Sequence, residues 1–252
     1  MHRTIGVSAM SFFPLFLRPG GWGQIRTMVE MGGEAGTLPL QLLPLRGLQE
    51  THVAMFDVVS FEGPWNYGTL VQAAQRFLHV KGDENPSFID LALFGSEANC
   101  TQRIEMIRRF HPRALAIDAP EWAQGGLIEL GPNMHKGAAR RWNGYTPSGV
   151  VLDTFHWMEL GDQAETILAE NGGYPAVKAI HLRLSSTDDT QEFLSQSRSS
   201  VARELLAEFA DQAPNAPIII EAQGLKALED GSRYGPQAGL YQIVKRIKEV
   251  IQ

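Results

Sequence analysis

The sequence is poor in the features that mark disulfide-rich and nucleic-acid-binding proteins. It contains one cysteine, Cys100, in 252 residues, which excludes an internal disulfide framework and a cysteine-rich metal site. Its formal net charge is −6, and basic residues cluster no further than short pairs such as Arg140-Arg141. Charge therefore gives no support to binding of a nucleic-acid backbone.

Long apolar runs are also lacking. The first 21 residues hold one apolar stretch, but Arg18 and Pro19 end it before it reaches the length of a membrane span. No small-residue cleavage pattern follows it, so a signal peptide is not expected. The apolar fraction of 44% and the charged fraction of 20% are ordinary for a globular chain. These observations predict a cytoplasmic protein without a membrane partner.

The sequence does contain an alternation of short apolar runs and helical patterns. Eight runs are predicted as strands: 4–10, 38–45, 54–61, 114–118, 126–130, 149–153, 177–184 and 217–222. Several are continuously apolar, as expected for parallel strands covered on both faces. Helical patterns lie between most of them, at 23–32, 67–80, 96–110, 163–171, 199–212 and 238–252.

Eight such alternations predict an α/β fold, a (β/α)8 TIM barrel, in preference to an open doubly wound sheet. No glycine fingerprint of a dinucleotide-binding fold follows any predicted strand. Two connections in the first half, 46–53 and 119–125, are too short for a barrel helix, so short or missing helices are expected there. No linker or low-complexity stretch divides the chain, which predicts a single domain over 1–252.

Metal-capable residues stand at or just past the ends of most predicted strands. Taken singly, each has an ordinary alternative as a helix cap, a salt-bridge partner or a core histidine. A shared role is favoured because several take equivalent places on successive strands, whose C-terminal ends meet at one rim of a barrel. The residues are Glu62, Asp118, Glu129, Asp153, His156, His181 and Glu221.

Grouped carboxylates repel one another, and a divalent cation relieves that repulsion. The set of Glu129, Asp153, His181 and Glu221 is rich in oxygen. Such a set predicts one divalent metal ion, with Mn²⁺ preferred and Mg²⁺, Co²⁺ or Zn²⁺ as alternatives. A closed structural zinc site fits it poorly.

Three segments resemble the last strands of the xylose isomerase-like TIM barrels: LDTFH at 152–156, IHLR at 180–183 and IIIEAQG at 218–224. That superfamily includes sugar-phosphate isomerases and epimerases, ketose 3-epimerases, inosose dehydratases and apurinic-site endonucleases. The resemblance implies that Glu129, Asp153, His181 and Glu221 hold the metal and that His156 faces the substrate. Two departures concern the substrate more than the metal. Only 24 positions (129 to 153) separate Glu129 from Asp153, so a brief helix at 134–142 is expected, and Arg183 stands where many members have Lys.

The resemblance implies a metal-dependent isomerase or epimerase of a small ketose, polyol or related hydroxy-carbonyl compound, acting through an enediolate. Glu129 and Glu221 would then be catalytic and exchange the proton with the substrate. The expected substrate-binding residues are His156, Arg183, Glu62, Asp118 and Trp65. Phe155 and Trp157 are further aromatic candidates, with core packing as their alternative role.

Two alternatives stay open: an apurinic-site endonuclease-like metal-dependent hydrolase, and a non-catalytic barrel of the same family. Endonucleases of this type need histidines on strands three and four, where this chain has Glu62 and Asp118. They also need an Asp-x-His pair after strand seven, and 185–200 contains no histidine. The expected partner is therefore a small carbohydrate rather than nucleic acid, and a homo-oligomer is left open.

Overall fold

The computed structural model describes residues 3–13, 15, 18–33, 37–42, 56, 58–64, 88–92, 115–117, 127–131, 149–222, 225 and 235–252. Within these ranges all strands are parallel neighbours in chain order. They are β1 (Ile5–Ser8), β2 (Leu40–Leu42), β3 (Val58–Pro64), β4 (Phe88–Ala92), β5 (Leu115–Ile117), β6 (Leu127–Leu130), β7 (Gly149–Asp153), β8 (Val177–Leu184) and β9 (Ile218–Ala222). Because β9 pairs back with β1, the sheet closes into a barrel.

The predicted barrel class is confirmed, but the described residues form nine strands where eight were expected. The additional strand is β4, which pairs with β3 and β5. Its sequence, FIDLA, carries Asp90 at its centre. That charge interrupts the apolar run, which is why periodicity did not reveal the strand.

Side chains along β1, β7 and β8 alternate between a face toward the helices and a face toward the barrel interior. Val7, Leu152 and Ile180 belong to the hydrophobic core between the barrel and its helices. Residues one position along the same strands face the opposite way, because side chains alternate in a strand. Ser8, Asp153 and His181 are therefore directed to the interior, and all three are buried. This alternation sets which residues can line a site at the barrel rim.

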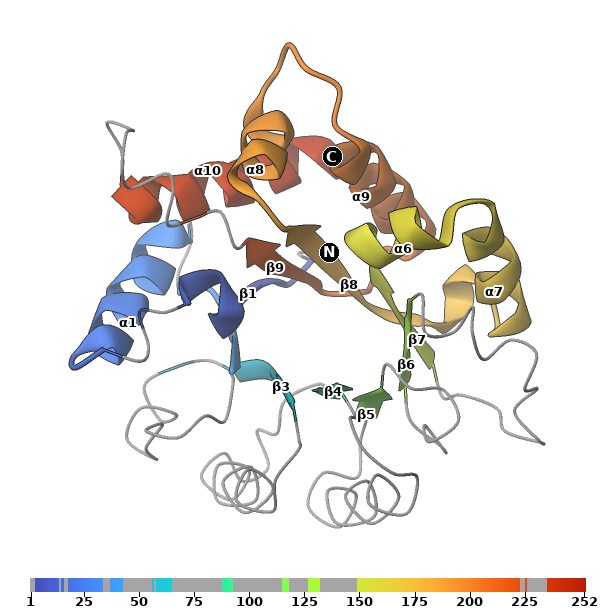
Figure 1. The fold of residues 1–252 in the computed structure, drawn as a ribbon, viewed down its shortest axis with the longest axis horizontal. Coiled ribbons are helices and arrows are strands. Elements are labelled where there is room, and N and C mark those ends of the chain that lie inside the picture. Colours follow the sequence, from blue (N-terminus) through green and yellow to red (C-terminus); the bar gives the residue numbers. More distant parts are fainter. Residues whose placement is uncertain are drawn as a thin grey trace.

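The described helices lie on the outer side of the barrel, along β1 and β6 to β9 (Figure 1). They are α1 (Gly21–Gly32), α6 (Thr154–Leu160), α7 (Ala164–Glu170), α8 (Thr187–Leu194), α9 (Val201–Gln212) and α10 (Gly235–Val250), with 3-10 turns η1 (Ala9–Phe12), η4 (Gly161–Gln163) and η5 (Tyr174–Ala176). The first and last helices pack side by side (Figure 1). They approach closely at Gly32, where a Cβ atom would lie 2.8 Å from Cδ2 of Leu240.

The helices predicted at 23–32, 163–171, 199–212 and 238–252 are found as α1, α7, α9 and α10. The helices predicted at 67–80, 96–110 and 134–142 lie outside the described residues. The same holds for the two short connections at 46–53 and 119–125. None of the helices in the described part of the chain combines the length and apolarity that crossing a bilayer requires.

Candidate metal centre

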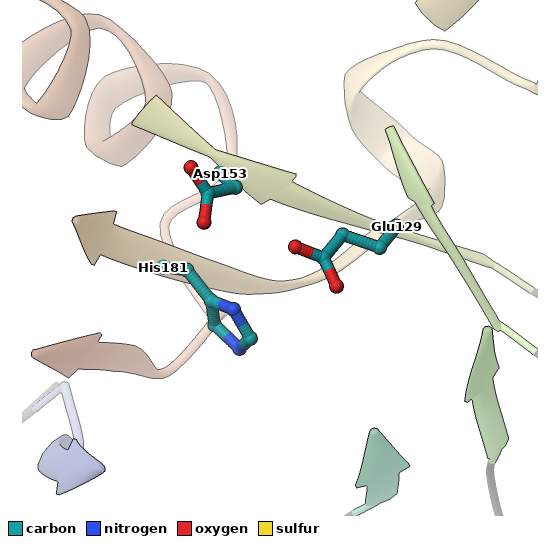
Figure 2. Close-up of side chains that lie close together, drawn as sticks. All are labelled: Glu129, Asp153 and His181. Carbon is teal, nitrogen blue, oxygen red and sulfur yellow. The ribbon is translucent and has the colours of Figure 1, made fainter. Parts of the chain in front are cut away.

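Three of the predicted ligands converge at the C-terminal ends of neighbouring strands. Glu129 on β6, Asp153 at the end of β7 and His181 on β8 each offer one ligand atom, and these atoms lie within 4.8 Å of one another. The strand register explains this placement, since Asp153 is paired with His181 and Glu129 with Val151, two residues before Asp153. Figure 2 shows the three side chains pointing toward a common space. All three are buried.

Asp153 uses its two carboxylate oxygens differently. Its Oδ1 accepts hydrogen bonds from the backbone N–H groups of Phe155 at 2.7 Å and His156 at 3.0 Å, and so caps the N-terminus of α6. Its Oδ2 is buried and has no hydrogen-bond partner among the residues that the structure describes. A buried carboxylate oxygen left in this way is costly unless a cation binds it. This observation fits a metal ion at the centre.

His181 is held in the form that can bind a metal ion. Its burial lowers its pKa to about 4, although the nearby Asp153 carboxylate opposes that effect. The imidazole is therefore neutral at physiological pH, and a neutral imidazole nitrogen is the metal-ligating form. Glu221, the fourth predicted ligand, lies on β9 next to His181, with Oε1 3.3 Å from Nδ1 of His181, but it is not part of the group of three whose ligand atoms lie within 4.8 Å of one another. Because His181 is neutral, this contact is not an ion pair at neutral pH.

The two predicted substrate-binding residues of the second half lie next to this centre. Nε2 of His156 is 3.7 Å from Oε1 of Glu129 and 3.5 Å from Nη1 of Arg183. On its other side, Nδ1 of His156 is 2.9 Å from Oε2 of Glu159. A proton on Nδ1 shared with Glu159 leaves Nε2 as the acceptor that faces Arg183.

Sequence reasoning missed Glu159. The i, i+3 spacing from His156 on a helix was the available signal, but no helix was predicted at 154–160. The structure places the helix directly after Asp153, so His156 and Glu159 share one face. The result is a chain of polar contacts from Glu159 at the protein surface to the buried Glu129.

The aromatic candidates divide between the site and the core. The ring centroid of Phe155 lies 5.3 Å from the guanidinium carbon of Arg183, beside the centre. Trp157 belongs to the hydrophobic core and packs edge-on against Phe209, with the ring centroids 4.9 Å apart. Of the two roles expected for Trp157, core packing is the one found, because α6 turns this position toward α9.

The remaining predicted site residues come from the first half of the chain. The backbone of Glu62 lies in β3, paired with Asp90 of β4. Asp118 and Trp65 lie outside the described residues. Their predicted roles in substrate binding stay predictions.

No family model matches the chain, and no curated protein matches it. Solved structures match over nearly the whole length. An uncharacterized protein from Parabacteroides distasonis superposes with a TM-score of 0.59 at 15% identity, over 99% of this chain and 98% of that one. The IolI protein, whose crystal structure holds a bound zinc atom, gives 0.57 at 8% identity, over 98% of both chains.

A xylose isomerase domain protein from Alicyclobacillus acidocaldarius subsp. acidocaldarius gives a TM-score of 0.53 at 11% identity, over 98% of both chains. At identities this low, the structural match shows the fold alone. The chain therefore has the fold of the xylose isomerase-like TIM barrels, which agrees with the resemblance seen in the sequence.

Proposed function

We propose that this protein is a divalent-metal-dependent isomerase or epimerase of a small ketose, polyol or related hydroxy-carbonyl compound. One observation carries the proposal: Glu129, Asp153 and His181, buried and within 4.8 Å of one another, meet at the strand ends of a barrel. This is the rim at which TIM barrels build their active sites. The likeness to a xylose isomerase domain protein supports the same class of chemistry.

The metal would be held by Glu129, Asp153 and His181, with Glu221 as the fourth ligand. The donor set favours Mn²⁺ or a similar ion, since it offers three carboxylates and one imidazole. A bound divalent ion supplies Lewis-acid polarisation of a substrate carbonyl. That polarisation acidifies the neighbouring C–H bond.

The proton is moved by Glu129 and Glu221. These carboxylates come from β6 and β9, with β7 and β8 between them, so they approach a bound ligand from two sides. One carboxylate takes the proton from the carbon beside the carbonyl, and the C–H electron pair forms the double bond of the enediolate. Return of a proton to the opposite face of the same carbon restores the carbonyl and gives the epimer. Its return to the former carbonyl carbon gives the isomer, when the hydroxyl proton of the first carbon passes to the former carbonyl oxygen. His156 and Arg183 bind the substrate oxygens during this exchange.

The first test combines metal analysis with a substrate screen. The chelator-treated protein is reloaded with Mn²⁺, its metal content is measured by mass spectrometry, and ketoses, inososes and sugar phosphates are screened in D₂O. We expect one metal ion per chain and deuterium at the carbon beside the carbonyl of the substrate that turns over. Two or three ions per chain would instead favour the endonuclease-like alternative. Product formed without deuterium would contradict proton exchange through these glutamates.

With that substrate, Glu221→Gln tests the proton transfer directly. The amide keeps the shape of the side chain but removes its basic oxygen, so turnover should fall about 10²–10⁴-fold, with a smaller loss of Mn²⁺ affinity. Glu170→Gln is the matched control, because Glu170 is exposed on α7. Near-normal turnover by Glu221→Gln would show that Glu221 is not the base.

A further inference from the structure

A buried amide in the first half of the barrel is left without hydrogen bonds. Gln41 of β2 has a relative exposure of 0%. Neither its Nε2 nor its Oε1 has a hydrogen-bond partner in the part of the chain that the structure describes. A glutamine amide offers two donors and one acceptor oxygen, and burying all of them unmet is unfavourable. Such a group in a native fold requires an explanation.

The strand register shows which way Gln41 faces. Leu40 is paired with Val7 of β1, and both belong to the core between the barrel and its helices. Gln41 is the next residue of β2 and is paired with Ser8. Because successive side chains in a strand alternate between its faces, Gln41 is directed into the barrel interior.

The same register relates Gln41 to the metal centre. On the adjoining strands Val7 is paired with Ile220, so Ser8 and Glu221 are the residues that follow on β1 and β9. Glu221 is in turn paired with Arg183 of β8. The inward positions therefore run around one rim from Arg183 through Glu221 and Ser8 to Gln41. Gln41 and His181 are both buried.

We propose that Gln41 is a substrate-positioning residue that binds a hydroxyl-bearing part of the ligand, beside the part held at the metal centre. A hydroxyl group both donates and accepts, which matches an amide that has both functions unmet. A phosphate or carboxylate only accepts and is better matched by arginine or lysine. The part of the ligand bound at Gln41 is thus an uncharged, hydroxyl-bearing part, as a polyhydroxy compound offers. The inference rests on the proposed function insofar as it places the ligand at the same rim.

The role predicts that binding and stability respond in opposite ways to one substitution. Gln41→Met keeps the length of the side chain and removes the amide. If the amide exists to bind ligand, the metal-free variant should melt at the same temperature as the wild type or higher. The Mn²⁺ dissociation constant should not change, because Gln41 is no metal ligand. The dissociation constant of a polyol should rise about tenfold, since two neutral hydrogen bonds are lost.

The experiment measures these three quantities for the wild type, Gln41→Met and the matched control Gln24→Met, whose side chain is exposed on α1. The probes are glycerol, erythritol and xylitol, titrated into the Mn²⁺-loaded protein by calorimetry. Support is a weaker xylitol affinity in Gln41→Met alone, with melting unchanged or raised. A lower melting temperature or failure to fold would overturn the proposal, because it would make the amide a structural group. Equal xylitol affinity in all three proteins, or none in the wild type, would also overturn it.

This outcome is separable from that of the proposed function. If substrate turnover is found but Gln41→Met binds polyols normally, the positioning role fails and the isomerase stands. If no turnover is found while polyol affinity depends on Gln41, the binding role stands and the isomerase fails.

Discussion

At the scale of single residues, Asp153 connects the fold to the chemistry. One carboxylate oxygen holds the first turn of α6, and the other is turned into the barrel toward Glu129 and His181. The cap also determines where His156 lies, because its backbone N–H is one of the two groups bound. The proposed metal ligation and the placement of a substrate-binding candidate therefore involve the same side chain.

Two substitutions of Asp153 should separate these roles. Asparagine caps helices about as well as aspartate, and it removes a buried charge that is repelled by its neighbours, so Asp153→Asn should leave the free energy of unfolding of the metal-free protein unchanged or higher. It replaces an anionic ligand, and Mn²⁺ affinity should fall more than about 100-fold, beyond the loss of about 10–100-fold that outer-shell changes cause. Asp153→Ala should lose the metal and also about 1 kcal/mol of capping stability. Urea unfolding and Mn²⁺ titration measure the two effects, and wild-type Mn²⁺ affinity in Asp153→Asn would rule out ligation by this residue.

At the scale of secondary structure, local signals position the segment that follows β8. Ser186 accepts a hydrogen bond from the N–H of Asp189 at 3.1 Å, and Asp189 accepts one from the N–H of Ser186 at 3.0 Å. Ser186, the N-cap of this capping box, lies two residues after the end of β8, and α8 begins at Thr187. Arg203 of α9 then donates to the backbone carbonyls of Glu192, Phe193, Ser195 and Arg198, which ties the end of α8 to the start of α9.

Ser186→Ala should lower the free energy of unfolding by about 1 kcal/mol, because replacing an N-cap residue by alanine costs about 0.5–2 kcal/mol. Mn²⁺ affinity should stay at the wild-type value, because Ser186 contributes no ligand atom to the metal centre. Chemical denaturation followed by circular dichroism gives the stability. Ser199→Ala is the control, since Ser199 is exposed outside the helices. Equal losses in both variants would show that the capping box contributes no stability of its own.

At the scale of the whole molecule, the barrel gathers buried charge of one sign at its rim. Glu129, Asp153 and Glu221 are at most 9% exposed and come from three strands of one closed sheet. Without a cation these carboxylates are poorly solvated and repel one another. A divalent ion would remove that penalty and join β6, β7 and β8 through its ligands.

Mn²⁺ should therefore stabilise the entire fold. A ligand present at 100 times its dissociation constant adds about 2.7 kcal/mol to the free energy of unfolding, which for a chain of this size raises the melting temperature by about 5–10 °C. Differential scanning calorimetry of chelator-treated protein, with and without Mn²⁺, measures the shift. Asp153→Ala should show little of it. If saturating Mn²⁺ leaves the melting temperature of the wild type unchanged, a metal site that links these strands is contradicted.

Much of the second half could be predicted from local pattern. The runs at 149–153 and 177–184 are apolar apart from their candidate site residues and the exposed Lys178, and the structure has strands at the same bounds. Once those strands are parallel neighbours, their ends meet at one rim, so residues placed there in the sequence are brought close in space. The convergence of Glu129, Asp153 and His181 followed from this reasoning.

Other features depend on contacts between residues far apart in the chain. The strand β4 was missed because Asp90 interrupts its apolar run, and its place in the sheet follows from pairing with β3 and β5. The predicted strand at 4–10 ends at Ser8, whose side chain caps η1 by accepting from the N–H of Met10. Nothing near Gln41 in the sequence marks it as buried and inward-facing, because its direction follows from the pairing of Leu40 with Val7. Local pattern determines the order of the strands and which of their residues are apolar. The register between strands and the closure of the sheet determine which side chains share the barrel interior. Register and closure could not be predicted, because they depend on how nine separate segments pair with one another.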